Sequence, residues 1–181
     1  MIDRRARFEA QVLVHLDAAY GYARWLAGSP SDADDVVQEA MLRAFRGYDA
    51  LRGESVKAWL LAIVRNCHAT ARRQQARRGQ VPLPAEDDAQ DGHALVARGA
   101  EPERNAMDRD AARTLERLVS TLSEEHREVL VLREIEDLTY REIAAVTLLP
   151  IGTVMSRLAR ARAALRAQCE LDAPGAPRAV R

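Results

Sequence analysis

The chain has 181 residues, enough for one domain or two small ones, and its 27 basic and 27 acidic side chains cancel to a net charge of zero. It contains no apolar run near the length of a membrane-spanning helix, so we expect neither a signal peptide nor membrane insertion. The two cysteines, Cys67 and Cys169, fit no metal-ligand spacing, and we therefore expect no metal, no cofactor and no disulfide.

Charge is segregated along a chain whose composition favours helices. Alanine, leucine, arginine and glutamate dominate, and no period-two apolar run of convincing length predicts a strand. Residues 1–51 carry 6 basic and 8 acidic side chains, residues 52–79 carry 7 and 1, residues 80–137 carry 7 and 15, and residues 138–181 carry 7 and 3. Two basic segments separated by an acidic one indicate two anion-binding surfaces.

Residues 8–27 have the apolar spacing of a first helix. The side chains expected on its inner side are Phe8, Val12, Leu16, Tyr20 and Ala23. The sequence Gly28-Ser-Pro30 then ends the helix, because glycine and proline interrupt helical patterns. The pattern therefore predicts one continuous helix with one buried stripe.

A second helix is predicted after Ser31, which suits an N-cap. Asp32 and Asp35 lie in its first turn, where the helix dipole favours negative charge. The predicted buried stripe is Val37, Met41, Ala44, Phe45 and Tyr48. Asp35, Gln38 and Glu39 remain on or beside the outer face. Physical chemistry alone interprets that face as helix capping and a solvated surface.

A third helix is predicted after Ser55, which can cap it. Its apolar stripe is Trp59, Leu60, Ile63, Val64 and Cys67. The other sides carry Lys57, Arg65, Asn66, Arg72 and Arg73. Positive charge beside a tryptophan is typical of helices that bind single-stranded nucleic acid. Trp59 lies on the stripe, which favours a core role for it, so the arginines are the stronger candidates.

The chain is predicted to fold as an all-α protein of two small helical domains joined by a flexible linker. Residues 80–103 have no helical period and are rich in Pro, Gly, Asp and Glu, which predicts an acidic linker between residues 1–79 and 104–169. Helices are expected over residues 107–122 and after Ser123. The tail, residues 170–181, is expected to be disordered.

The stretch from Thr139 to Gln168 has the outline of a helix-turn-helix, two short helical patterns around a break at residues 147–150. Thr139 and Glu142 form a capping box at its start. The apolar stripe of its second helix is Val154, Leu158, Ala161 and Leu165. Opposite or beside that stripe lie Thr153, Ser156, Arg157 and Arg160. Such side chains reach phosphates and base edges in a major groove, although an ordinary helical hairpin with a solvated basic face remains the alternative.

The run Pro150-Ile-Gly-Thr-Val-Met-Ser-Arg-Leu158, followed by Arg160-Ala-Arg162, resembles the DNA-binding domain of bacterial sigma factors of the extracytoplasmic-function group. The runs 32–39 and 58–66 resemble the first domain of that family. The resemblance implies a cytoplasmic promoter-specificity subunit with three partners: core RNA polymerase, through the clamp coiled coil and the flap of its large subunits, promoter DNA, and an anti-sigma factor. The family usually has glycine in the turn where this chain has Leu148, which would be strained at positive φ.

The resemblance also implies a role for each candidate residue. The residues expected to open and read the minus-ten element are Lys57, Trp59, Arg65, Asn66, Arg72 and Arg73. Those expected to read the minus-thirty-five element are Thr153, Ser156, Arg157 and Arg160. Those expected to bind the polymerase are Asp32, Asp35, Gln38 and Glu39.

Two rival functions come from other classes. A stand-alone helix-turn-helix regulator would explain the second domain but leaves the basic helix after Ser55 unexplained. An enzyme acting on nucleic acid would need clustered carboxylates or a metal site, and none has ligand spacing in the sequence. The sequence therefore predicts a sigma factor without catalytic residues of its own.

Overall fold

The computed structural model describes residues 3–51, 55–79, 114–115 and 117–172, and every regular element within these ranges is helical. The elements are α1 (Arg4–Val12), η1 (Leu13–His15), α2 (Leu16–Ala27), α3 (Pro30–Gly47), η2 (Tyr48–Ala50), α4 (Val56–Arg77), α6 (Glu124–Leu130), the π-helical turn η3 (Val131–Ile135), α7 (Tyr140–Thr147) and α8 (Ile151–Asp172). The predicted all-α class is confirmed. The predicted linker, residues 80–103, lies outside the described residues, and α8 extends three residues into the predicted tail.

The first helix was predicted as one continuous element, and this was wrong. A 3₁₀ turn at Leu13–His15 separates α1 from α2. Because a 3₁₀ turn has three residues per turn instead of 3.6, the buried face rotates after it. Leu16 and Tyr20, predicted to lie inside, are 39% and 38% exposed, whereas Tyr22 is fully buried.

The cap of the second helix was also misplaced by two residues. Ser29, not Ser31, is the N-cap of α3, and its Oγ accepts a hydrogen bond from the backbone N–H of Asp32 at 3.2 Å. Pro30 occupies the first helical position, where its fixed φ and missing N–H are tolerated. The longer helix buries Ala33, Val36 and Ala40, and Phe45, predicted to lie inside, is 37% exposed.

Helix α4 is the central element of the first domain. The predicted cap is confirmed, because Ser55 Oγ accepts a hydrogen bond from the N–H of Ala58 at 3.3 Å. Leu60, Leu61 and Val64 are fully buried where α4 packs against α2 and α3. Cys67 is 3% exposed, which confirms its prediction as a core thiol.

The second domain consists of α6, η3, α7 and α8. Its capping box is confirmed: Thr139 Oγ1 accepts from the N–H of Glu142, and the Glu142 carboxylate accepts from the N–H of Thr139 at 2.8 Å. Leu138 and Ile143, on either side of this cap, are both buried. The chain bends by 103° between α7 and α8, within the range typical of a helix-turn-helix.

The turn between α7 and α8 keeps the left-handed backbone that glycine normally supplies. Leu148 has φ 57° and ψ 33°, and its N–H donates to the carbonyl of Ala144. Its side chain is 78% exposed, so it gains little from burial. A leucine in this conformation is strained by contact between Cβ and the carbonyl oxygen, by about 1–2 kcal/mol.

We therefore expect Leu148→Gly to raise the free energy of unfolding by about 1 kcal/mol, measured by urea denaturation. The matched control is Leu42→Gly, because Leu42 is 49% exposed within α3. That change should lower the free energy of unfolding by about 1 kcal/mol, since glycine weakens a helix interior. Destabilisation by Leu148→Gly would contradict the assigned strain.

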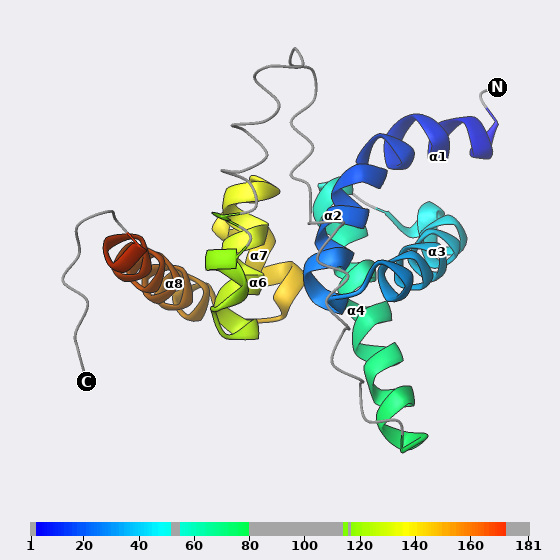
Figure 1. The fold of residues 1–181 in the computed structure, drawn as a ribbon. Helices are drawn as coiled ribbons and strands as arrows, with labels where there is room; N and C mark the ends of the chain where they lie inside the picture. The colour runs from blue at the N-terminus through cyan, green and yellow to red at the C-terminus, as the bar shows by residue number, and fades with distance from the viewer. Residues whose placement is uncertain (1–2, 52–54, 80–113, 116, 173–181) are drawn as a thin grey trace, which may run out of the picture.

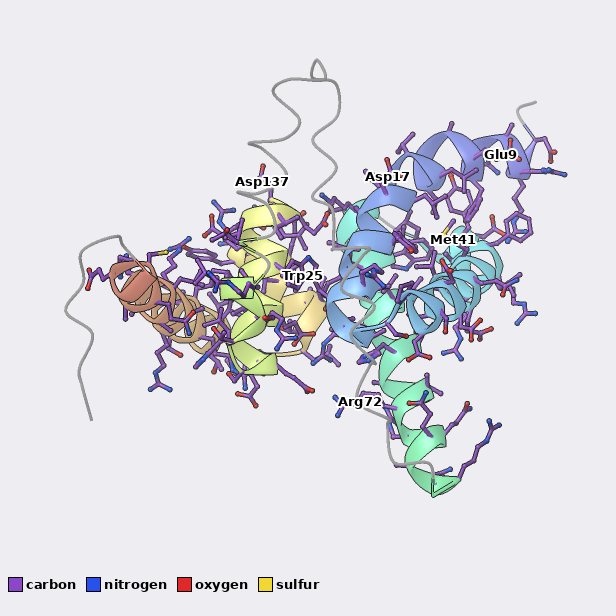
Figure 2. The ribbon with its side chains drawn as sticks, viewed as in Figure 1. Glu9, Asp17, Trp25, Met41, Arg72 and Asp137 are labelled. Carbon is purple, nitrogen blue, oxygen red and sulfur yellow. The ribbon has the colours of Figure 1, made fainter. Side chains whose placement is uncertain are left out.

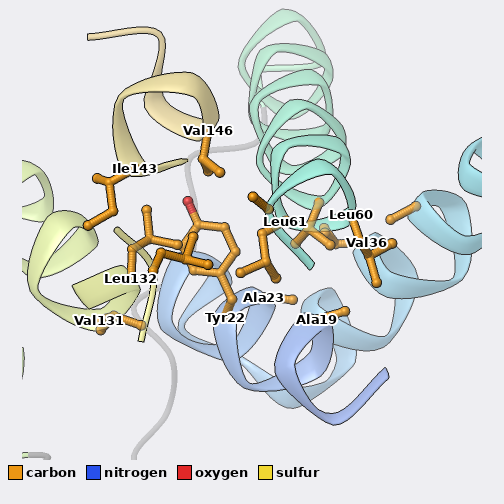
Figure 3. Close-up of a cluster of buried hydrophobic side chains, with 14 of the residues drawn as sticks. Ala19, Tyr22, Ala23, Val36, Leu60, Leu61, Val131, Leu132, Ile143 and Val146 are labelled. Carbon is orange, nitrogen blue, oxygen red and sulfur yellow. The ribbon is translucent and has the colours of Figure 1, made fainter. Parts of the chain in front are cut away.

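The two domains share one hydrophobic core. The second domain lies beside α2 and α4, on the side away from α3 (Figure 1). Tyr22 packs among side chains of both domains, with Leu61 on one side and Leu132 and Ile143 on the other (Figure 3). Its hydroxyl donates to Glu128 Oε1 at 2.8 Å. Burial and the neighbouring Glu128 carboxylate raise the pKa of Tyr22 well above its ordinary value.

Candidate nucleic-acid and polymerase interfaces

The minus-ten candidates on α4 divide into two groups. Lys57, Arg65 and Arg72 follow one another at intervals of eight and seven residues. At about 100° and 1.5 Å per residue, they lie within about 80° of one another around the helix, spaced by about 12 Å and about 10 Å along it. We call these three residues the cationic row. Asn66 and Arg73 are exposed away from it, and Arg73 donates to the Ala69 carbonyl at 3.1 Å.

Each member of the cationic row is paired with a carboxylate of the second domain. Lys57 Nζ lies 2.8 Å from Glu136 Oε2 and also donates to the Glu136 backbone carbonyl at 2.8 Å. The remaining two pairs are Arg65 Nε with Glu128 Oε1 at 2.7 Å and Arg72 with Glu124 Oε2 at 2.9 Å. Figure 2 shows Arg72 in the C-terminal half of α4. The row therefore lies in the interface between the domains.

Burial and neighbouring charges both shift the pKa values of groups in these pairs. Glu136 is 6% exposed, and burial raises the pKa of its carboxyl, although Lys57 partly opposes this effect. Burial lowers the pKa of Arg65, but the hydrogen bond and the charge of Glu128 outweigh it, so the net pKa shift is upward. Burial and the charge of Arg72 lower the pKa of His68. The interface thus joins charged partners with a histidine whose charged form is disfavoured.

Trp59 has the position of a core residue. It is partly buried and packs against the hydrophobic core. A Cβ placed on Gly47 of α3 would lie 3.9 Å from its ring, so the indole is close to the α3 backbone. This position agrees with the core interpretation and gives the ring little freedom to stack on a base.

The candidates on α8, the second helix of the helix-turn-helix and here called the recognition helix by analogy with that motif, also fall into two groups. Ser156 and Arg160 are exposed on the outer face of α8, opposite the buried Val154 and Leu158. Thr153 is half-buried. The Arg157 side chain is only 20% exposed and pairs with Glu125 of α6 at 2.8 Å. Of the four predicted residues, Ser156 and Arg160 are therefore the ones exposed on the outer face.

The outer face of α8 includes apolar residues that the sequence interpretation missed. Met155 and Ile151, one turn apart, are 52% and 43% exposed, and Ala159 is exposed one turn further on. Apolar side chains in a major groove contact the methyl group of thymine. The signal for them in the sequence is their four-residue spacing beside Ser156.

The polymerase-binding candidates form an outward face of α3. Asp32, Asp35 and Gln38 are exposed, while Ala33, Val36 and Val37 between them are buried. Glu39 is half-buried and accepts from Arg43 Nε at 2.6 Å. The face presents carboxylate and amide oxygens, so it suits a partner rich in hydrogen-bond donors.

In the described part of the chain, no three His, Cys, Asp or Glu side chains are placed so that they could hold a metal ion. No single described helix combines the length and apolarity needed to cross a membrane, and only the sharply bent pair α7–α8 has a suitable length and composition when taken together.

Two family descriptions match the chain. Residues 12–78 match the family described as Sigma-70 region 2, and residues 112–165 match that described as Sigma-70, region 4. The first match contains α2 to α4, and the second contains α6 to most of α8. The matched stretches thus contain the cationic row, the acidic face of α3 and the recognition helix.

Named relatives and solved structures show the same similarity. The ECF RNA polymerase sigma-E factor of Escherichia coli (strain K12) is 36% identical over 140 residues, which cover 74% of this chain and 72% of that protein. The RNA polymerase sigma-H factor of Pseudomonas aeruginosa is 36% identical over 170 residues, 90% and 86% of the two chains. The sigma factor RpoE of Bartonella quintana, solved with the anti-sigma factor NepR, has a TM-score of 0.69 at 25% identity, covering 92% of this chain and 98% of that one. CnrH, solved with the cytosolic domain of CnrY, has a TM-score of 0.63 at 26% identity, covering 94% and 92%.

Proposed function

Because the chain belongs to the extracytoplasmic-function group of the sigma-70 family, we propose that it is a promoter-specificity subunit, which binds core RNA polymerase and starts transcription at chosen promoters. The observation that carries this proposal is the presence of both regions, 2 and 4, on one chain. The chain would act in the cytoplasm and have no chemistry of its own, because the polymerase catalyses RNA synthesis.

The proposed division of labour follows the two domains, residues 1–79 and 104–169. The polar face of α3 binds the polymerase through Asp32, Asp35, Gln38 and Glu39. The cationic row of α4, together with Asn66 and Arg73 on another side of that helix, holds the separated minus-ten strand. The outer face of α8 reads the minus-thirty-five duplex, with Arg160 and Ser156 as its polar contacts.

The α3 face gives a test of polymerase binding. We expect Asp35→Lys to weaken binding to core RNA polymerase about tenfold, because it puts a cation among the oxygens proposed to make the contact. The matched control is Glu9→Lys, since Glu9 is an exposed carboxylate of α1 and not of the α3 face. Equal effects of the two changes on the dissociation constant, measured by fluorescence anisotropy, would contradict the assigned face.

The recognition helix gives a test of duplex reading. We expect Arg160→Ala to weaken binding to duplex promoter DNA by about 1–3 kcal/mol and to relax base preference at one position, since an arginine that pairs with a base edge carries that much discrimination. The measurement is a binding selection on randomised duplexes. Arg5→Ala is the control, because Arg5 is an exposed residue of α1 paired with Glu9. An unchanged base preference would contradict the proposal that Arg160 contacts a base edge.

The stand-alone regulator predicts a different behaviour. It would bind duplex DNA tightly without polymerase and would not elute with the core enzyme. We propose instead that gel filtration with purified core RNA polymerase gives one stoichiometric complex. Binding to duplex alone, with no such complex, would favour the regulator.

An anti-sigma factor is the third proposed partner. Two of the similar structures were solved as complexes of a sigma factor with its anti-sigma factor or, for CnrH, with the cytosolic domain of CnrY. Purification of the tagged chain from its native cells should therefore recover a stoichiometric inhibitor under non-inducing conditions. Recovery of only polymerase subunits in that experiment would count against this partner.

A further inference from the structure

The carboxylates that cover the cationic row pair with it one to one. Glu124 and Glu128 lie one turn apart on α6, and Glu136 follows the π-helical turn η3. They pair in reverse order with Arg72, Arg65 and Lys57, so the acidic edge runs antiparallel to α4. The basic segment, residues 52–79, thus meets part of the acidic segment, residues 80–137, within the same chain.

This edge occupies the nitrogen atoms that would hold a DNA strand. The Lys57 and Arg65 side chains are only 26% and 29% exposed to solvent. Arg65 Nε is already bonded to a carboxylate oxygen, and Lys57 Nζ contacts two oxygens of Glu136. A phosphate offers the same kind of anionic oxygen as a carboxylate, so the strand and the acidic edge require the same partners.

The contact between the domains has a solvent-exposed polar border. The outermost pair, Arg72 with Glu124, is exposed by 57% and 74%, and exposed ion pairs contribute at most about 1 kcal/mol. A pocket of about 370 Å³ remains between the domains, with Arg65, Arg72 and Glu128 among its lining residues. The interface therefore combines an apolar centre around Tyr22 with a loosely packed polar border.

We propose that the second domain is an intramolecular competitor for single-stranded DNA: Glu124, Glu128 and Glu136 stand where strand phosphates bind, so the free chain is closed and its domains must separate before α4 can hold a strand. This inference rests on the proposed function, because it assumes that the cationic row binds the minus-ten strand. It adds that the apparent affinity for the strand is the affinity of the open form multiplied by the fraction of chains that are open. Polymerase docking would increase that open fraction.

The test compares two double variants of the full chain with the unmodified protein. Glu124→Gln with Glu128→Gln removes two charges from the acidic edge and keeps the side-chain shapes. Glu134→Gln with Glu170→Gln removes two charges from the same domain, where Glu134 pairs with Arg162 of α8 and Glu170 is exposed. The probe is a fluorescein-labelled single-stranded DNA of mixed sequence, without polymerase, and the readout is fluorescence anisotropy.

We expect the edge variant to bind the probe about tenfold more tightly than the control variant, because neutral amides hold the arginines less strongly and the open fraction rises. Its radius of gyration from small-angle scattering should also increase. An edge variant that binds no more tightly than the control, with an unchanged radius of gyration, overturns the inference. If the edge variant does not fold, Glu124→Gln alone serves, because this carboxylate is 74% exposed; a gain of about threefold is then expected and no gain overturns the inference.

Transcription by the unmodified chain with core polymerase separates this inference from the function it rests on. Initiation by the unmodified chain, with no gain in probe binding by the edge variant, overturns the closed form and leaves the sigma function standing. A gain in probe binding by the edge variant, without any initiation by the unmodified chain, supports the closed form and contradicts the proposed sigma function.

Discussion

Replacing Leu61 with alanine is expected to lower the free energy of unfolding by about 3 kcal/mol. Leu61 is fully buried on α4, next to Tyr22 and near the side chains of the second domain (Figure 3). Removing three methyl or methine carbons there forfeits their transfer free energy and leaves a cavity that close neighbours cannot fill. Urea denaturation, followed by circular dichroism, measures the effect.

The control for this prediction is Leu42→Ala on α3. Leu42 is 49% exposed, so its truncation should change the free energy of unfolding by no more than about 0.5 kcal/mol. A loss below about 1 kcal/mol for Leu61→Ala would contradict the placement of α4 at the centre of the core.

The second large effect concerns the cationic row. We expect Arg65→Ala with Arg72→Ala to reduce specific initiation by on the order of a hundredfold, because hydrogen bonds to charged groups are each worth about 1.5–3 kcal/mol. Opening of the domains cannot compensate, since the open form of this variant lacks the cations themselves. Multi-round transcription with core polymerase measures initiation, and gel filtration measures polymerase binding, which should persist.

Arg5→Ala with Arg7→Ala is the matched control, because it removes two exposed arginines of α1 and leaves α4 unchanged. We expect initiation by this control to stay within about threefold of the unmodified protein. Equal losses for the two double variants would mean that the effect follows total charge and not the cationic row.

Local signals in the sequence predicted local structure well. The caps at Ser55 and Thr139 were predicted because they depend on a hydroxyl and the next three residues. The left-handed turn at Leu148 was foreseen from the position where the family has glycine. The register of α2 was not predictable in this way, because a single 3₁₀ turn rotates every later residue and the periodicity on either side of it still looks helical.

Long-range pairing was the part that sequence reasoning missed. Segregated charge indicated two basic segments, which lie on α4 and α8, but the carboxylates of residues 124–136 were not foreseen as partners of α4. Glu128 is 63 residues from Arg65 and 106 from Tyr22, and no local pattern reports contacts over such separations. Arg157 was predicted to face DNA, and its ion pair with Glu125 joins two separate helices of the second domain, a contact that local spacing likewise does not report.

The central claim is that this chain directs RNA polymerase to promoters, and the most direct measurement is multi-round transcription by purified core enzyme on a library of promoter DNA, with and without the chain. Initiation is expected at a defined subset of sequences only when the chain is present, with start sites at a fixed distance from the shared elements. Duplex binding without polymerase, together with no chain-dependent initiation, would contradict it.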